Sequence, residues 1–271
     1  MAEIAGSYYS ENGVFREVNS LDPSVFSKGT VLYEVLRIWQ GKALFLEDHM
    51  NRLQQSLKLS GYSYDVSIAT IRELLSELTK INALTIGNVK VNIVFTEDQP
   101  VVYAFFIPYA YPNAGMYERG VTAEFFHASR NNPNIKKLNP EMISQVNAII
   151  KERQLYDVLL VGDDGVITEG SKTNVFFIRN NEIYTAPGSL VLRGITREKV
   201  ISLCNDQGIK IHEALLHKEK LSDFNAAFFS GTSPKILPIR SISGIEFHTD
   251  DPLVLKLMKV YDDLIDSYLQ N

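Results

Sequence analysis

The chain has 271 residues, of which 45% are apolar and 22% are charged, a composition typical of globular proteins that excludes extensive disorder. At roughly 150 residues per domain, this length predicts about two domains. The 32 acidic residues outnumber the 27 Lys and Arg and give a formal net charge of −5, with no basic stripe that could neutralise a run of phosphates. Nucleic acid is therefore not expected as a partner, and the expected ligand is a small molecule.

The sequence predicts a cytoplasmic protein that does not enter a membrane. Its single cysteine, Cys204, cannot form an intrachain disulfide, and the apolar spacing around it suggests a buried thiol, so no oxidising compartment is indicated. The opening residues lack the basic start and apolar core of a signal peptide. The longest apolar run, from Val101 to Tyr111, is too short to span a bilayer and contains Pro108.

The first third of the chain is predicted to run from strands to helices and back to strands. Residues 31–39 are rich in β-forming side chains, and the turn signal that follows them indicates a hairpin. Met50, Leu53 and Leu57 recur at helical spacing, and Gly61 stands where a C-terminal cap is expected. The expected elements are strands at 31–39, 43–46, 89–95 and 101–107 and helices at 47–59 and 68–79.

Residues 108–115, with two prolines, one glycine and no periodicity, are the best candidate linker. The predicted fold class is α/β with mixed α+β features, divided into a small domain at 1–110, a linker at 111–116 and a larger domain at 117–271. Asn180 and Asn181 suit a two-residue hairpin turn because asparagine tolerates positive φ. In this part, strands are expected at 121–127, around 158 and 175, and at 210–211, 226–229 and 236–239, with helices at 141–153, 196–207 and 252–268.

Two patterns look chemical but have structural explanations. Residues 165–173 nearly match the phosphate-binding loop of nucleotide hydrolases, which raises the hypothesis of a nucleotide-binding module. That loop requires Lys directly after its second glycine, whereas Ser171 stands before Lys172, and the following residues resemble a strand. His212 and His217 are five residues apart rather than the four of a zinc helix, so no metal site is expected.

Three separated segments carry groups that suit a bound phosphate. Arg52 lies two residues after Met50, so its side chain need not point into the core, although a surface position explains it as well. Residues 194–196 lead into a predicted helix whose first-turn amides and dipole attract an anion, while Thr196 could simply cap that helix. Residues 230–233 follow a predicted strand and offer a hydroxyl and an amide, or form an ordinary turn.

Lys136 and Lys137 are adjacent in an extended segment, so their side chains point to opposite sides and one of them could face inward. A lysine acts as a catalytic amine only when its pKa falls from about 10.4 toward neutrality, through loss of water or a neighbouring cation. Spacing alone does not choose between the two lysines, and adjacent lysines are commonly solvated. Glu169 precedes Gly170 between two predicted strands, where glycine permits close approach of a ligand, although loop glutamates are usually exposed.

These segments occur in the order of a known family. The motifs are GxxxYExxR, HxxRL, IKxLN, xTEGSxxNxF, xxLxGIT and SGT, and they extend from about Gly29 to Ile239. The chain resembles the fold type IV pyridoxal 5′-phosphate (PLP) enzymes, also called class IV aminotransferases, which include branched-chain and D-amino acid aminotransferases and aminodeoxychorismate lyase. The resemblance implies two α/β domains with the cofactor at their interface, and a homodimer.

The resemblance also implies a role for each matching residue. Lys136 is similar to the lysine that forms a Schiff base with the cofactor aldehyde, whereas Lys137 falls at a variable position. Glu169 is similar to the acid that pairs with the pyridine nitrogen, and Arg52 resembles the phosphate-binding arginine. The remaining residues that the resemblance assigns to cofactor binding are Asn174, Leu192, Gly194, Ile195, Thr196, Gly231 and Thr232.

The substrate is less well defined by the resemblance. Tyr33, Val35 and Arg37 share one face of the predicted strand that matches family positions lining the site, so Tyr33 and Arg37 are candidates for contact with the substrate carboxylate. Residues 93–97 lack the arginine and histidine that hold this carboxylate in the D-amino acid enzymes, which favours an L-amino acid. Glu141 stands where branched-chain enzymes carry a tyrosine, so a typical member of that group is not expected.

The resemblance thus predicts a PLP-dependent aminotransferase that moves an amino group between an amino acid and a 2-oxo acid through Lys136. The alternative is a lyase that splits 4-amino-4-deoxychorismate into 4-aminobenzoate and pyruvate. The motif IKxLN is shared with the lyases, whereas SGTSPKILPI is more similar to the aminotransferases.

Overall fold

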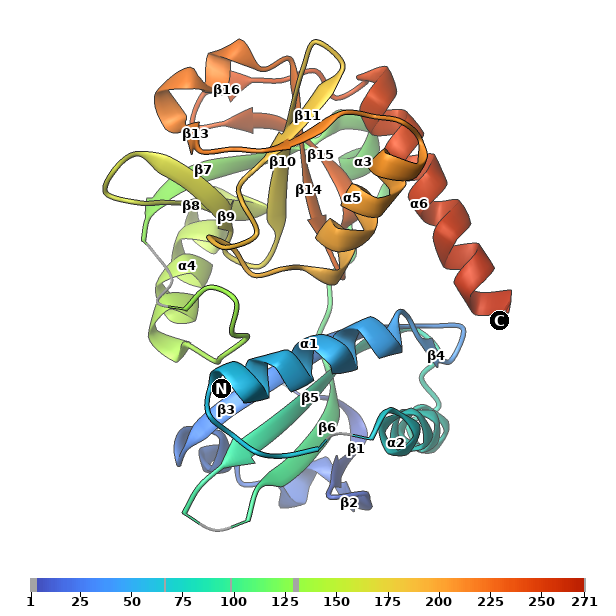
Figure 1. Cartoon of the computed structure of the whole chain (residues 1–271). Coiled ribbons are helices and arrows are strands. Elements are labelled where there is room, and N and C mark those ends of the chain that lie inside the picture. The colour runs from blue at the N-terminus through green and yellow to red at the C-terminus, as the bar shows by residue number, and fades with distance from the viewer. Residues whose placement is uncertain (1–3, 66, 98, 129–131, 271) are drawn as a thin grey trace. The chain divides into compact units, whose positions relative to one another are not determined.

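The computed structural model describes residues 4–65, 67–97, 99–128 and 132–270 (Figure 1). The chain divides into two compact units. Unit 1 comprises Met1–Ala110, Ile135–Leu138 and Tyr268–Asn271, and unit 2 comprises Tyr111–Asn134 and Asn139–Ser267. The short segment that contains Lys136 therefore belongs with the N-terminal residues. The domain boundary expected at 111–116 stays a prediction.

Unit 1 is built on a six-stranded antiparallel sheet with the strand order β2-β1-β6-β5-β3-β4. β3 pairs with β5 from Thr30, opposite Phe95, to Ile38, opposite Gly87. Because side chains alternate along a strand, the even-numbered residues of β3 face one side of the sheet and the odd-numbered residues face the other. The strands are β1 (Ala5–Glu11), β2 (Val14–Glu17), β3 (Thr30–Trp39), β4 (Lys42–Ala43), β5 (Gly87–Phe95) and β6 (Val101–Ile107).

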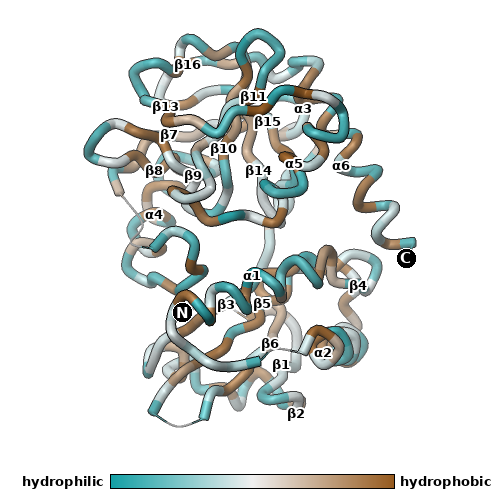
Figure 2. Tube along the Cα trace, viewed as in Figure 1, coloured by the Kyte–Doolittle hydropathy of each residue, from teal (hydrophilic) through white to brown (hydrophobic). Residues whose placement is uncertain are grey.

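Two helices, α1 (Leu46–Leu59) and α2 (Ile68–Ile81), pack on one face of this sheet and share a hydrophobic core with it. Met50, Leu53 and Leu57 of α1 are buried in that core, and hydrophilic and hydrophobic stretches alternate along the helix in Figure 2. Removing each such side chain from water contributes roughly 1.5–3 kcal/mol. Gly61 follows α1 with a φ of 76°, which confirms the predicted C-terminal cap.

The hairpins of unit 1 differ from the prediction in two ways. The strand expected at 43–46 ends at Ala43, because α1 already begins at Leu46. The β1–β2 hairpin was missed, although Asn12 and Gly13 form its two-residue turn with φ values of 48° and 83°. An Asn-Gly pair is a strong hairpin signal, so the sequence contained the information.

Unit 2 contains a ten-stranded mixed sheet with the main order β12-β11-β10-β14-β15-β7-β8-β9-β13, and β16 pairs with β15. The pairings of β7 with β8 and with β15 are parallel. β9 and β10 lie far apart in the strand order but contact each other, so the sheet curls on itself. The strands are β7 (Val121–His127), β8 (Asp157–Val161), β9 (Val166–Gly170), β10 (Asn174–Arg179), β11 (Glu182–Thr185), β12 (Ile211–Glu213), β13 (Leu216–His217), β14 (Ala226–Gly231), β15 (Lys235–Ile242) and β16 (Ile245–Glu246).

The helices of unit 2 pack against this sheet. α5 packs against β14. Within the sheet, the rings of Phe176 of β10 and Phe228 of β14 stack with centroids 4.9 Å apart. Cys204 of α5 is buried, as predicted, and burial raises its thiol pKa to about 11. The helices are α3 (Ala114–Arg119), α4 (Pro140–Arg153), α5 (Ile195–Asp206) and α6 (Pro252–Gln270), and short 3-10 helices lie at Val18–Ser20, Pro23–Ser27 and Lys218–Asp223.

In unit 2, the β10–β11 turn agrees with the sequence prediction, whereas the position of Glu169 differs from it and the element after Thr173 excludes a phosphate-binding loop. Asn180 and Asn181 form the β10–β11 turn with φ values of 53° and 59°, as predicted. Glu169 lies within β9 rather than in a loop between strands. Thr173 is followed by β10, whereas a phosphate-binding loop requires a helix there, so the nucleotide-binding hypothesis was wrong.

Neither a membrane-spanning helix nor a metal-binding cluster occurs among the described residues. None of the helices at 4–65, 67–97, 99–128 and 132–270 combines the length and apolar character needed to cross a membrane. In the same part of the chain, no three or more His, Cys, Asp or Glu side chains gather closely enough to hold a metal ion.

Candidate active site

In unit 1, α1 meets β3 at a buried carboxylate. Glu34 is fully buried, and its Oε1 accepts a hydrogen bond from Nε of Arg52 at 2.8 Å while its Oε2 accepts one from Nη2 at 2.6 Å. Nδ1 of His49 lies 2.7 Å from the same Oε2. Burial alone would raise the pKa of Glu34, but the Arg52 charge and the hydrogen bonds from both partners lower it to about 2. Glu34 therefore holds the Arg52 guanidinium in one orientation.

Lys136 lies beside the same helix and strand. Its carbonyl oxygen accepts a hydrogen bond from the amide of Tyr33 at 3.2 Å, and its amide donates to Oγ of Ser56 at 3.4 Å. Ser56 follows Arg52 by one turn of α1, so both side chains are on the same helix face. Nζ of Lys136 lies 4.9 Å from the centre of the Tyr33 ring. Burial lowers the pKa of His49, and the charges of Arg52 and Lys136 add to that effect.

The two adjacent lysines differ in exposure. Residues 136–138 run antiparallel to β3, since Lys137 bridges to Leu32 and the amide of Leu138 donates to the carbonyl of Val31 at 3.2 Å. In this extended segment Lys136 is half-buried and Lys137 is exposed. The predicted alternation of the two side chains is therefore present, and Lys136 is the lysine that approaches Tyr33.

A lysine on β5 was missed by the sequence analysis. Lys90 pairs with Val35 across β3 and β5, so its side chain shares the face of Tyr33 and Arg37. Its Nζ lies 4.4 Å from the centre of the Tyr33 ring, and burial lowers its pKa to about 8. The guanidinium of Arg37 lies 4.9 Å over the ring of Trp39 and is buried. This face of unit 1 thus gathers two cationic side chains and one tyrosine.

Asn92 adds an acceptor to the same face. It is 1% exposed, and its Oδ1 has no hydrogen-bond partner among the residues that the structure describes. An unsatisfied buried polar atom costs about 1–3 kcal/mol, so a water or a polar ligand that donates to this oxygen would be stabilised here. The sequence signal was the run VKVNIVF, where Lys90 and Asn92 alternate with apolar residues and mark one polar strand face.

In unit 2, the side chains of Glu169 and Asn174 both bind the main chain of Leu192. Oε2 of the buried Glu169 accepts a hydrogen bond from the amide of Leu192 at 3.2 Å. Nδ2 of Asn174 donates to the carbonyl oxygen of the same Leu192 at 2.9 Å. A Cβ at Gly194 would lie 2.2 Å from Oδ1 of Asn174, so only glycine permits this close approach. Glu169 and Asn174 thus fix the backbone that leads into α5.

The predicted role of Thr196 as a helix cap was wrong. α5 begins at Ile195 with Gly194 at its N-cap, so Thr196 is the second residue of the helix. Its Oγ1 accepts a hydrogen bond from the hydroxyl of Tyr261 at 3.3 Å, and its side chain is buried. The first amides of an α-helix lack partners within the helix and point toward its N-terminus, where they and the helix dipole suit an anion.

Gly231 and Thr232 lie at the end of β14 and in the turn that follows it. Ser230 precedes them, pairs with Asn174 across β14 and β10, and is fully buried. Its Oγ has no hydrogen-bond partner among the described residues, which makes it a second orphaned polar atom on a strand that carries predicted site residues. Ser230 was not assigned from the sequence, although it stands in the SGT motif.

The predicted residues therefore form one group in each unit. In unit 1, Lys136, Arg52 and Tyr33 lie around α1 and β3, while Arg37 shares only the strand face of Tyr33. The group in unit 2 consists of Glu169, Asn174, Leu192, Gly194, Ile195 and Thr196, with Gly231 and Thr232 on the neighbouring strand end.

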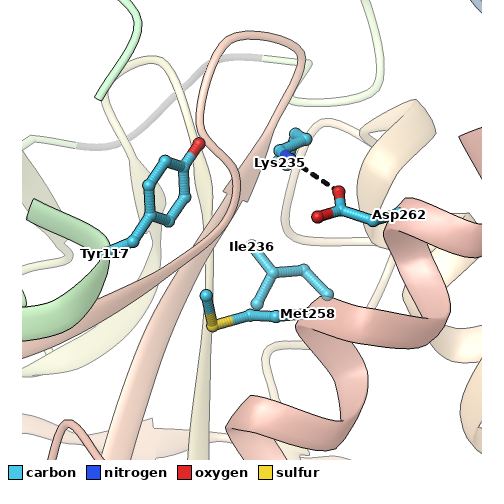
Figure 3. Close-up of a pocket in the computed structure, with 5 residues that line it drawn as sticks. All are labelled: Tyr117, Lys235, Ile236, Met258 and Asp262. Atoms are coloured by element: carbon cyan, nitrogen blue, oxygen red, sulfur yellow. Dashed lines mark hydrogen bonds and ion pairs between the residues drawn. The ribbon is translucent and has the colours of Figure 1, made fainter. Parts of the chain in front are cut away.

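A pocket elsewhere in unit 2 contains none of the predicted residues (Figure 3). It is lined by Tyr117 of α3, Lys235 and Ile236 of β15, and Met258 and Asp262 of α6. Nζ of Lys235 pairs with Oδ1 of Asp262 at 2.5 Å, so the two charges at this pocket compensate each other. It offers no reactive group that the predicted chemistry needs.

Comparison with known proteins defines the family. A family model described as amino-transferase class IV matches residues 31–242. The chain belongs to the class IV aminotransferases. It is 30% identical over 229 residues to the D-alanine aminotransferase of Bacillus licheniformis, with 80% of each protein covered. It is 28% identical over 241 residues to the branched-chain-amino-acid aminotransferase of Escherichia coli strain K12, which covers 80% of this chain and 78% of that protein.

Solved structures support the fold. A crystal structure of the branched-chain amino acid aminotransferase of Escherichia coli superposes with a TM-score of 0.85, at 23% identity, over 96% of this chain and 95% of that one. Another similar structure is a branched-chain amino acid aminotransferase with pyridoxamine 5′-phosphate, whose TM-score is 0.84 at 19% identity over 98% of this chain and 96% of that one. The predicted mixed α/β fold of a fold type IV enzyme is confirmed. The predicted membership of the class IV aminotransferases is confirmed as well. This family consists of enzymes that depend on PLP.

The Glu34–Arg52 pair can be tested by stability measurements. Glu34→Gln should lower the free energy of unfolding by about 3 kcal/mol, because it leaves the buried Arg52 charge uncompensated. The loss should shrink as the pH falls from about 4.5 toward 2, where the carboxylate of the folded protein becomes protonated. Urea unfolding at pH 7 and at pH 3 measures both effects.

A matched control is Glu77→Gln, which removes an exposed ion pair with Lys80 on α2. Its cost should stay below about 1 kcal/mol at either pH. Equal losses for the two variants would contradict a stabilising role of the buried pair.

Proposed function

We propose that this chain is a PLP-dependent aminotransferase that moves an amino group between an L-amino acid and a 2-oxo acid, with Lys136 as the catalytic amine. The observation that carries the proposal is the position of Lys136 in unit 1. Its main chain is hydrogen-bonded to Tyr33 and Ser56, and its Nζ lies over the Tyr33 ring. Lys137, by contrast, is exposed.

The residues of unit 2 fit the cofactor. When bound, PLP supplies an electron-withdrawing pyridine ring that stabilises negative charge on the substrate. The buried carboxylate of Glu169 suits a protonated pyridine nitrogen. The N-terminus of α5, with Gly194, Ile195 and Thr196, suits the phosphate, and Oγ of Ser230, which lacks a partner among the described residues, adds a polar atom.

Further cofactor contacts are assigned by position. Gly231 and Thr232 would offer an amide and a hydroxyl to the phosphate, Leu192 would lie against the ring, and Asn174 would support the loop. In unit 1, Arg52 would bind the phosphate, because a guanidinium whose orientation is fixed by Glu34 loses less freedom when it binds an anion.

Lys136 does the acid–base work in this proposal. Its Nζ would hold the cofactor and, once released by the incoming amino acid, would take the proton from Cα of that substrate and pass it to the cofactor carbon that receives the amino group. The main-chain hydrogen bonds to Tyr33 and Ser56 limit the positions of this amine, which favours repeated transfer along one path.

The polar face of unit 1 suits the substrate carboxylate. Tyr33, Arg37 and Lys90 bring a hydroxyl and two cations to this face, and Asn92 adds an acceptor for the amino group or a water. Residues 93–97 lack the arginine and histidine expected in D-amino acid enzymes, which supports an L-substrate even though one relative is named a D-alanine aminotransferase. A homodimer and a cytoplasmic location complete the proposal.

The reaction class is tested with a single substrate. Purified protein loaded with PLP and mixed with one amino acid at a time should convert the cofactor to pyridoxamine 5′-phosphate, because transamination leaves the amino group behind. Absorbance spectra over a broad panel of L- and D-amino acids record this change. If no donor produces it and 4-amino-4-deoxychorismate instead yields pyruvate, the lyase is the correct assignment.

The assignment of the catalytic amine is tested by two neighbouring substitutions. Lys136→Ala should abolish turnover, because no other group takes over both attachment and proton transfer, while Lys137→Ala should keep most of the activity. Borohydride reduction followed by peptide mapping should label Nζ of residue 136 in the wild-type protein. Activity that survives at position 136 and disappears at position 137 would refute the assignment.

Lys90 on the polar face of unit 1 is expected to lower the stability of the folded protein while it improves substrate binding. Lys90→Met should raise the free energy of unfolding by roughly 1–3 kcal/mol at pH 7, because a buried charge is removed, and should raise the KM for the amino acid. The stability gain should be complete below pH 8 and shrink between pH 8 and 10.5, where the folded wild-type protein loses this proton first.

The control is the exposed Lys58 of α1, since Lys58→Met should change neither the stability nor the KM appreciably. Urea unfolding at pH 7 and pH 10 and steady-state kinetics give the readouts. An unchanged KM in Lys90→Met would remove Lys90 from the substrate face.

A further inference from the structure

Unit 2 contains a buried carboxylate that has no place in the predicted chemistry. Asp157, the first residue of β8, is 0% exposed. Its Oδ1 accepts hydrogen bonds from the amide of Val158 at 2.8 Å, from the amide of Ser171 at 3.2 Å and from the hydroxyl of Ser171. Its Oδ2 accepts from the amide of Lys172 at 3.2 Å and from Oγ1 of Thr173 at 2.7 Å.

These bonds hold the turn that connects β9 to β10. Four of the five donors belong to residues 171–173, and the turn is closed by a bond from the amide of Gly170 to the carbonyl of Thr173 at 2.8 Å. A Cβ at Gly170 would lie 2.1 Å from Oγ1 of Thr173 and 2.6 Å from Oδ2 of Asp157. Glycine is therefore required at position 170 because the carboxylate and its donors approach the main chain there.

The same turn sets the spacing of two predicted cofactor residues. Glu169 immediately precedes Gly170, and Asn174 immediately follows Thr173. The carboxylate of Glu169 accepts a hydrogen bond from the amide of Leu192, and Asn174 donates one to the carbonyl oxygen of Leu192. The residues at both ends of the turn are therefore hydrogen-bonded to one residue that precedes α5. A shift of the turn would move the Glu169 carboxylate and the N-terminus of α5 together.

We propose that Asp157 is a positioning residue for the cofactor site, because its carboxylate locks the 171–173 turn and thereby sets the places of Glu169, Asn174 and the start of α5. This inference rests on the proposed function, since it assumes that these groups hold PLP. Asp157 touches neither cofactor nor substrate in this arrangement and acts only through the turn.

A carboxylate fits this position better than an amide of the same shape. All five groups that face Asp157 are donors, and a carboxylate accepts hydrogen bonds through both oxygens. In Asp157→Asn the side-chain NH2 would replace one acceptor oxygen. The amide of Lys172 or of Ser171 would then face another donor, and a buried donor without a partner is costly.

The experiment compares four variants of the full-length protein. Asp157→Asn removes one acceptor oxygen, and Thr173→Val removes one donor while keeping the side-chain shape. Thr173→Ser keeps the hydroxyl and is the conservative rescue. Asp164→Asn is the matched control, because Oδ1 of Asp164 accepts the amide of Val166 at 3.0 Å at the opposite end of β9.

Three readouts separate positioning from general stability. Amide hydrogen exchange of Ser171 and Lys172 in the cofactor-free protein reports the turn itself. The Kd for PLP, measured by fluorescence, and the induced circular dichroism of the bound cofactor report the geometry of the site. Melting temperatures allow every variant to be measured well below its unfolding transition.

We expect Asp157→Asn and Thr173→Val to speed exchange at Ser171 and Lys172, to raise the Kd for PLP about tenfold or more, and to change the circular dichroism of the bound cofactor. Thr173→Ser and Asp164→Asn should match the wild-type protein in all three. If Asp157→Asn does not fold, the Thr173→Val variant tests the positioning role, because valine keeps the shape of the side chain and only one hydrogen bond to Asp157 is lost.

Two contrary results are distinguishable. If wild-type protein binds PLP and the Asp157→Asn and Thr173→Val variants bind it with unchanged Kd and circular dichroism, the positioning role is overturned while the proposed function stands. If wild-type protein binds no PLP, the proposed function fails and the positioning role fails with it, whatever hydrogen exchange shows for the turn.

Discussion

A carboxylate that loses its water on burial must regain hydrogen bonds or an opposite charge, or it will take up a proton or destabilise the fold. Glu34 meets this requirement through Arg52 and His49, and Asp157 meets it through five donors. In the proposed function, both sets of partners determine the position of groups that would contact the cofactor. Because these carboxylates are buried, the geometry of Arg52 and of the 171–173 turn follows from the interior of each unit rather than from solvent-exposed contacts.

The choice between two adjacent lysines depends on the main chain. Residues 136–138 lie along β3 through a bridge and two hydrogen bonds, and this extended geometry sends neighbouring side chains in opposite directions. Lys136 thereby reaches Tyr33, while Lys137 stays exposed. A shift by one residue in this pairing would exchange the two lysines, so the backbone register is as important as the side chain itself.

Several buried polar groups make the folded protein less stable than apolar residues at the same positions would. Lys90 is a buried ammonium whose pKa is lowered to about 8, and the Oδ1 of Asn92 and the Oγ of Ser230 lack hydrogen-bond partners among the described residues. Stability alone does not explain such residues, since each costs free energy in the folded state. Polar ligands on the strand face of unit 1 and at the end of β14 would account for them.

Local patterns predicted much of this molecule. Alternation and helical spacing located α1, α2 and most strands, the Asn180–Asn181 turn followed from local φ preferences, and six short motifs in order indicated the family, because these signals depend on residues close in sequence. Tertiary structure was needed for the rest. The sequence did not reveal that Arg52 pairs with Glu34, that Lys90 and Asn92 share the face of Tyr33, or that Asp157 holds residues 171–173. These relations depend on strand register and on chain segments that meet only after folding, and no local spacing encodes them.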